Sequence, residues 1–207
     1  VELSHFVPRD WTATSLTATF PVRLAPHHQG TDAELDSYIE MLKKVVAQEI
    51  AVFGTTPRYD VGKYTFIADY LPWASGDGME HRNSTIITSS RPLLGNEKAL
   101  LGTASHEFFH SWNVERIRPR SLELFDFTRV NMSGELWFAE GFTSYYGPLF
   151  LRRAAVTSLT EYAHGLAGSI DAVVNDPGRR FGSPVEMSMQ APFVDAATSI
   201  DPTNEDN

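Results

Sequence analysis

The stretch His106-Glu107-Phe108-Phe109-His110 decides the interpretation of this 207-residue chain. It is an H-E-x-x-H pentad inside a segment with helical character. Side chains four residues apart lie one above the other on the same face of an α-helix, so both imidazoles can reach one metal ion. Glu107 points to a different side of the helix from the two His side chains. It is close enough to act on a water at the metal without binding the metal itself. The pentad therefore predicts two zinc ligands and a general base, whereas a helix with two hydrogen-bonded His and a surface Glu is the alternative.

A catalytic zinc ion needs a third protein ligand and an open position. Glu140 lies in the apolar run 136–142, in a helical pattern for which Ser133 is the expected N-cap. A carboxylate among apolar neighbours is costly to bury unless it is paired or bound to a metal. A surface Glu on a polar stripe is the alternative, but this run has hardly any polar stripe. We therefore expect Glu140 to be the third ligand, with Ser144 one turn later as a hydrogen-bond partner for it.

Three separated motifs follow one another along the chain: GMEHRNST at 78–85, HEFFHSWN at 106–113 and LWFAEGF at 136–142. Together they resemble the glycyl aminopeptidase-like metallopeptidases, a family of the gluzincin group with two His and one Glu on zinc. The long spacing from the pentad to Glu140 resembles this family more than the alanyl aminopeptidases. The resemblance implies an α+β, thermolysin-like zincin catalytic domain with a small mixed sheet and a helical lobe. It also implies a peptide substrate with a free N-terminus.

The first motif also resembles the Gly-Ala-Met-Glu-Asn exopeptidase motif of alanyl aminopeptidases, so Gly78, Met79 and Glu80 are expected to bind substrate. Glu80 would hold the α-ammonium group, so that only the first peptide bond reaches the metal. If residues 79–83 form an edge strand, they can pair with the substrate backbone. His81 stands where that motif has Asn, so the match is partial, and a polar turn with a surface Glu is the alternative.

One expected part of such an aminopeptidase is missing. The resemblance implies a Tyr in a Tyr-x-Lys-Gly context that stabilises the oxyanion, and the chain has no such motif after Glu140. Tyr145 and Tyr146 are turned off the helix face of Glu140. We therefore expect residues 26–207 to be an incomplete gluzincin catalytic domain and residues 1–25 to be the end of a preceding β-rich domain. The remaining domains of a longer parent chain are the expected partners.

Composition narrows the function further. The formal net charge of -9 argues against nucleic-acid binding, which needs a basic face. The absence of Cys excludes disulfides and thiolate zinc sites. No apolar run approaches the roughly 18 residues of a membrane span. The sequence itself does not identify the cellular compartment. The family resemblance implies a periplasmic or secreted location, as in many bacterial members.

Local patterns predict where helices and strands lie. A capping box of Thr31 and Glu34 predicts a helix that runs to Phe53 and ends at Gly54. No helix or strand is predicted after residue 175. The other predicted strands cover 12–24 with a break at Pro21, 63–70, and 79–88 as one strand or a pair. The other predicted helices are one that Asn96 caps and that runs through the pentad to Trp112, one that carries Glu140 and runs to about Ala155, and one over 160–174 with Thr160 as N-cap.

The predicted function is zinc-dependent peptide hydrolysis, with an aminopeptidase as the favoured form. A thermolysin-like endopeptidase, in which Glu80 is structural, is one alternative, and cleavage of a peptide with a blocked N-terminus separates the two. The other alternative is a metal-binding module with little activity because the chain is incomplete. Turnover by the purified chain separates that alternative from an enzyme.

Overall fold

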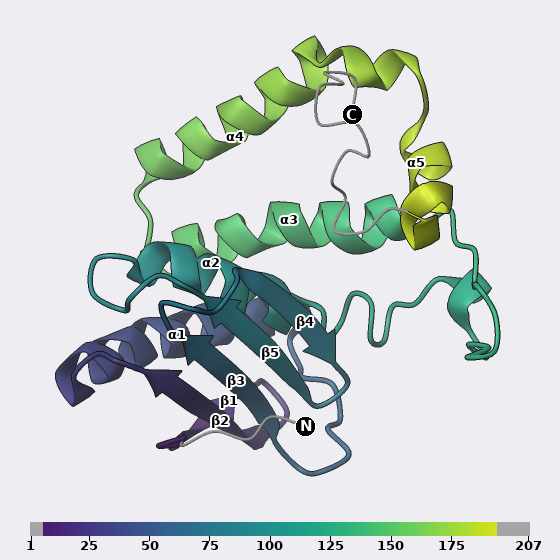
Figure 1. Cartoon of the computed structure of the whole chain (residues 1–207). Helices are drawn as coiled ribbons and strands as arrows, with labels where there is room; N and C mark the ends of the chain where they lie inside the picture. Colours follow the sequence, from purple (N-terminus) through teal and green to yellow (C-terminus); the bar gives the residue numbers. More distant parts are fainter. Residues whose placement is uncertain (1–5, 194–207) are drawn as a thin grey trace.

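The computed structural model describes residues 6–193, without the side chain of Arg179. A five-stranded mixed sheet forms one side of it, in the lower part of Figure 1. In chain order the strands are β1 (Arg9–Thr14), β2 (Thr19–His28), β3 (Tyr64–Tyr70), β4 (Asp77–His81) and β5 (Ser84–Ser89). They lie in the order β1-β2-β3-β5-β4. The three inner strands are parallel, and each edge strand is antiparallel to its neighbour.

Helices cover one face of this sheet and extend away from it, which confirms the predicted α+β class (Figure 1). The first helix connects the parallel strands β2 and β3, the usual crossover for such a pair. No helix within residues 6–193 is long and apolar enough to cross a membrane. The α-helices of the described residues are α1 (Asp32–Phe53), α2 (Glu97–Phe109), α3 (Leu136–Arg153), α4 (Leu159–Asn175) and α5 (Pro184–Gln190).

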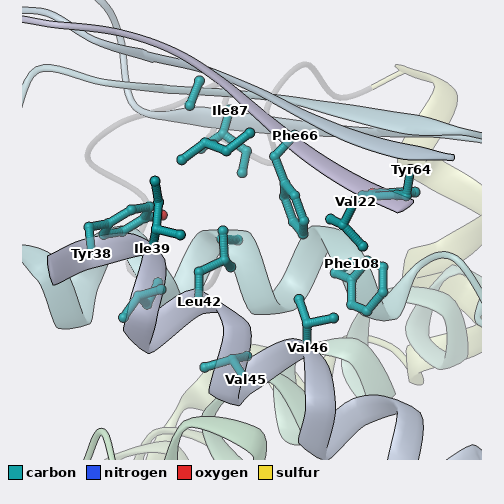
Figure 2. Close-up of a cluster of buried hydrophobic side chains, with 14 of the residues drawn as sticks. Val22, Tyr38, Ile39, Leu42, Val45, Val46, Tyr64, Phe66, Ile87 and Phe108 are labelled. Atoms are coloured by element: carbon teal, nitrogen blue, oxygen red, sulfur yellow. The ribbon is translucent and has the colours of Figure 1, made fainter. Parts of the chain in front are cut away.

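The core lies between the sheet and the helices α1 and α2 (Figure 2). Alternate residues of β3 are buried, as the predicted strand required. Val22 and Phe66 point from the sheet toward Leu42 and Val46 of α1 and toward Phe108 of α2. All five side chains are almost completely buried. This packing fixes the position and the rotation of α2 on the sheet.

The rotation of α2 decides where the pentad side chains point. Phe108 faces the sheet and lies two residues from each His of the pentad. Two residues correspond to about 200° around an α-helix, so His106 and His110 point away from the core that Phe108 enters. α3 packs against that side of α2. The apolar core thus presents the two imidazoles to the helix that carries Glu140.

Several local predictions are confirmed and one break is misplaced. Thr31 caps α1 in a capping box with Glu34, and Gly54 ends the helix with a φ of 73°. The predicted strand break at Pro21 is wrong, because Pro21 lies inside β2 and the break falls between β1 and β2. Pairing of β2 with β3 begins only at Val22. Pro21 therefore has no backbone hydrogen bond to donate to β3, and its missing N–H costs nothing there.

Two predicted helix starts are wrong by two residues. α3 has Glu135 at its N-cap, because Ser133 makes its hydrogen bonds to Glu135 rather than to the first turn. α4 begins after Ser158, whose side chain forms a capping box with Glu161. Thr160 lies inside the first turn. The S-x-x-E pattern was present in the sequence and is the stronger signal.

Near both ends of the described residues, the structure also differs from the predicted elements and the predicted domain boundary. α5 lies beyond residue 175, where no regular element was expected, and Ser183 caps it in a capping box with Glu186. Residues 194–207 lie outside the described residues. The predicted domain boundary after residue 25 falls within β2, and both β1 and β2 belong to the five-stranded sheet. A further β-rich domain before this chain stays a prediction.

A buried carboxyl group lies behind the pentad helix. Glu49 of α1 is fully buried, and its Oε1 lies 3.0 Å from Ser105 Oγ, which is 3.1 Å from the carbonyl oxygen of Gly147 in α3. Burial raises the pKa of Glu49 well above its ordinary value, opposed by the hydrogen bond with Ser105. The folded protein therefore keeps this proton at pH values where the unfolded chain has lost it.

This linkage predicts how stability changes with pH. The folded state binds one more proton than the unfolded state above the unfolded pKa of about 4.3, so the free energy of unfolding should fall as pH rises from there toward the folded pKa. Glu49→Gln has no such proton, and its stability should decline less between about pH 5 and about pH 8. Urea unfolding at both pH values measures this, with Glu40→Gln on the exposed side of α1 as control. An identical pH dependence in Glu49→Gln and the unaltered protein would refute the assignment.

Candidate functional site

The structure brings together the three residues predicted as metal ligands. His106 lies in the last turn of α2, His110 is the C-cap residue of that helix, and Glu140 lies on the facing side of α3. Glu140 Oε2 is 3.2 Å from His106 Nε2 and 3.6 Å from His110 Nε2. The residues are 34 and 30 positions apart in the chain, so only the packing of α3 on α2 brings them together. We call these three residues the metal centre.

The chemistry and spacing of the metal centre fit a zinc ion. Two imidazole nitrogens and one carboxylate oxygen are a ligand set of catalytic zinc sites. Ligand atoms about 2.0 to 2.2 Å from a tetrahedral zinc ion lie about 3.3 to 3.6 Å from one another. Of the two separations in the structure, 3.6 Å lies at the upper end of that range and 3.2 Å lies just below its lower end. The side chain of Glu140 is 44% exposed, which leaves an open side for a substrate.

The charges of the metal centre favour a cation. Burial acts to raise the pKa of Glu140, but the hydrogen bonds with His106 and His110 outweigh it and lower that pKa to about 2. Burial acts to lower the pKa of His110, and the hydrogen bond with Glu140 reverses the direction, so that this pKa is raised. Glu140 is therefore ionised at neutral pH, which is the form that binds a metal ion.

A second set of contacts orients His110, and sequence reasoning missed it. The Nδ1–H of His110 donates to the backbone oxygen of Asn113 at 2.7 Å, which leaves Nε2 facing Glu140. The side-chain amide of Asn113 donates to the oxygen of Ala139 at 3.1 Å and to Thr143 Oγ1 at 3.3 Å. Asn113 thus ties the loop that holds His110 to the helix that carries Glu140.

Ser144 has a different environment from the one expected. It is exposed, and its side chain makes no hydrogen bond to any residue between 6 and 193. Its role as a partner of Glu140 stays a prediction. Thr143, one residue earlier, is buried and contacts both Asn113 and the ring of His110. Sequence reasoning did not identify these contacts of Thr143.

Asn113→Ala is expected to weaken zinc binding about tenfold to a hundredfold, a typical loss when the groups that orient a metal ligand are removed. The backbone oxygen that orients His110 remains, but its loop loses the anchors on α3. Competition with a chelator of known affinity measures the zinc dissociation constant. Asn175→Ala, at the end of α4, is the matched control. An unchanged constant in Asn113→Ala would show that the loop holds its position without this side chain.

Glu107 lies beside the metal centre in a buried position. Its Oε2 is buried and has no hydrogen-bond partner among the described residues. A Cβ atom on Gly78 would overlap with the Glu107 side chain, so any other residue at position 78 would displace the Glu107 carboxyl group. Burial raises the pKa of Glu107 to about 7, with Glu80 and Glu140 adding to the shift while the two His side chains oppose it. A carboxyl group with a pKa near neutrality is suited to take up and release a proton.

The predicted substrate residues lie on β4, the edge strand nearest α2. Ligand atoms of Glu80, Glu107 and His110 all lie within 4.8 Å of one another, so Glu80 borders the metal centre. Met79 is 57% exposed, because alternation along the strand directs it to the other face. The structure therefore brings Gly78 and Glu80 to the site and leaves the side chain of Met79 outside it.

Comparisons with known proteins identify a family and a similar fold. Residues 99–207, which include the metal centre, match the family described as M61 glycyl aminopeptidase. A crystal structure of an aminopeptidase N family protein from Idiomarina loihiensis is similar in fold, with a TM-score of 0.74 and 24% sequence identity. The match covers 89% of this chain and 32% of that chain, so this chain spans about a third of that protein's length. A comparison with curated proteins gave no significant match.

Proposed function

Because the chain belongs to the M61 glycyl aminopeptidase family, we propose that it hydrolyses peptides with the help of a zinc ion held by His106, His110 and Glu140. One observation carries the proposal: Glu140 Oε2 lies 3.2 Å and 3.6 Å from the two imidazole nitrogens, with one side of the group open. When bound, zinc supplies a Lewis acid that polarises the substrate carbonyl and activates water for attack.

Glu107 is the proposed general base and acid. Its carboxylate takes a proton from the attacking water and later delivers that proton to the leaving amine. The Oε2 atom of Glu107 is buried and has no hydrogen-bond partner among the described residues, so it can hold this proton away from bulk water. The close passage of Gly78 holds the Glu107 side chain against β4. Both observations support a fixed position for the base.

Glu80 is the proposed anchor for the substrate's α-ammonium group. It borders the metal centre from the edge strand β4, whose outer side can pair with an extended peptide. An ammonium group held at this place leaves only the first peptide bond within reach of His106, His110 and Glu140. This arrangement favours release of N-terminal residues over cleavage within a chain.

Glu80→Ala is expected to lower kcat/KM for a free-amine reporter about thirtyfold, which corresponds to roughly 2 kcal/mol for a lost charge pair that is partly exposed. A reporter with an acetylated N-terminus should lose much less, because it carries no ammonium group. Both rates are measured on the zinc-loaded protein, with Glu40→Ala on α1 as the control. Equal losses for both reporters would favour the endopeptidase alternative.

A metal-binding module with little activity is the remaining alternative. The chain spans about a third of the length of the Idiomarina protein, and catalytic parts outside this chain are compatible with that difference. Zinc-loaded protein that turns over neither the free-amine nor the blocked reporter would support this alternative. Further domains of a longer parent chain stay a prediction.

A further inference from the structure

The side chain of Arg116 joins three segments of the chain close to the end of α2. Its Nη1 donates to the backbone oxygen of Ser111 at 3.3 Å and to that of Arg82 at 3.1 Å. Its Nη2 donates to the backbone oxygen of Arg58 at 2.8 Å. Ser111 follows α2, Arg82 lies in the turn between β4 and β5, and Arg58 lies between α1 and β3. One guanidinium group therefore fastens three segments that are distant in the sequence.

The surroundings of this guanidinium group fix its position. All three hydrogen bonds go to backbone oxygens, and the positive charge of the donor strengthens each of them. The ring of Tyr59 lies against the group, with 5.7 Å between the ring centre and Cζ of Arg116. Tyr59 is buried, and its hydroxyl donates to Ser111 Oγ at 3.4 Å. The planar fork of the arginine is thus held by the ring and by the three carbonyl groups together.

Two of the joined segments carry residues of the candidate site. Ser111 directly follows His110, and Arg82 comes two residues after Glu80. The same nitrogen, Nη1 of Arg116, donates to both segments. Ligand atoms of Glu80 and His110 lie within 4.8 Å of one another. Arg116 therefore bridges the backbone next to the metal centre and the backbone next to the proposed ammonium anchor.

The strand that carries Glu80 is held on both sides of this residue. Two residues earlier, Gly78 lies directly against the side chain of Glu107 on α2. Two residues later, the backbone oxygen of Arg82 accepts the hydrogen bond from Arg116. We propose that Arg116 is a positioning residue, which sets the distance between Glu80 and the metal centre and so the place of the substrate's α-ammonium group. The inference rests on the proposed function, in which Glu80 is the ammonium anchor.

Two small ligands that differ by one amino group test the proposal on the zinc-loaded protein without requiring turnover. Aminomethylphosphonic acid carries an ammonium group for Glu80 and a phosphonate for the metal centre, whereas methylphosphonic acid carries the phosphonate alone. The ratio of their dissociation constants, measured by calorimetry, gives the amine preference. Arg116→Gln should lower this preference about tenfold, because a displacement of about 1 Å is enough to weaken a positioned contact strongly. Methylphosphonic acid should bind the variant within about twofold of its original affinity.

Arg118→Gln is the matched control, since Arg118 lies on the same loop and is exposed. It removes the same charge and should leave the amine preference unchanged. Zinc content and circular dichroism are measured for every variant. An Arg116→Gln protein that loses its zinc would show that Arg116 supports the metal centre rather than Glu80, and would overturn the inference.

A double substitution separates the positioning of Glu80 from a general structural role. Glu80→Ala should itself remove most of the amine preference. Adding Arg116→Gln to it should change the affinity for aminomethylphosphonic acid by no more than about twofold, because the carboxylate to be positioned is absent. A loss of about tenfold in both backgrounds would show that Arg116 acts independently of Glu80, and that result would overturn the inference.

Arg116→Lys keeps the proposal testable if Arg116→Gln does not fold. Lysine retains the charge, but its single nitrogen cannot hold three carbonyl groups in the way that a planar fork does. The variant should therefore lower the amine preference about threefold while it keeps its zinc and its circular dichroism spectrum. In that case an unchanged amine preference in Arg116→Lys would overturn the inference.

The outcomes also separate this inference from the proposed function. If Glu80→Ala removes the amine preference and folded Arg116→Gln keeps it, Arg116 does not position the anchor, while the anchor itself stands. If Glu80→Ala leaves the amine preference unchanged, the ammonium anchor is wrong and the inference is overturned with it. Failure of both ligands to bind zinc-loaded protein would overturn the proposed function and the inference together.

Discussion

Glu107→Gln is expected to lower kcat/KM of the zinc-loaded protein for a free-amine reporter by about a hundredfold or more, while about one zinc ion per chain stays bound. Gln has nearly the same shape as Glu but cannot take up the proton of the attacking water. Zinc should stay because the proposed ligands are His106, His110 and Glu140. Reporter kinetics and elemental analysis on the same preparation give both values.

The control for this prediction is Glu97→Gln, in the first turn of the same helix and away from the metal centre. It should leave both the rate and the zinc content unchanged. A Glu107→Gln protein with bound zinc and a near-normal rate would show that another group accepts the proton. A variant that loses its zinc would instead place Glu107 among the metal ligands.

His110→Ala is the second change with a large expected effect, and it should remove the zinc. His110 is 1% exposed, and its Nε2 faces Glu140 while its Nδ1 is held by Asn113. Without this ring the metal centre keeps two ligands, fewer than the three that catalytic zinc sites use. Elemental analysis after dialysis should find about one zinc ion per chain in the unaltered protein and almost none in the variant. His164→Ala, on the exposed face of α4, is the control.

His106→Ala completes this test, because His110 belongs to two groups of possible ligands. One group contains His106 and Glu140, and the other contains Glu80 and Glu107. Loss of zinc in both His variants supports the proposed metal centre. Zinc kept at full occupancy in His106→Ala but lost in His110→Ala would move the ion to the second group.

The parts of the site that depend on local spacing were predictable from the sequence. The i, i+4 spacing of the pentad puts both imidazoles on one helix face wherever that helix lies. The apolar surroundings of Glu140 signalled a carboxylate with a special partner, and the structure places it against both imidazoles. The alternating residues of β3 and the capping box at Thr31 were equally local.

The parts that depend on packing were not predictable in the same way. Asn113 contacts α3 only because α2 and α3 pack side by side. The position of Asn113 in the sequence does not indicate this contact. The close contact of Gly78 is with the side chain of Glu107, which lies on another element. Ser188 accepts the backbone N–H of Trp137 in α3 from α5, which lies in a region where no element was expected. Contacts of this kind are set by tertiary structure.

The most direct test of the central claim is a crystal structure of the zinc-loaded protein with anomalous scattering recorded at the zinc absorption edge. The predicted result is one strong peak about 2.0 to 2.2 Å from His106 Nε2, His110 Nε2 and a carboxylate oxygen of Glu140, with Glu107 outside bonding distance. A peak bound instead by Glu80 and Glu107, or no peak at the metal centre in protein that retains zinc, would contradict it.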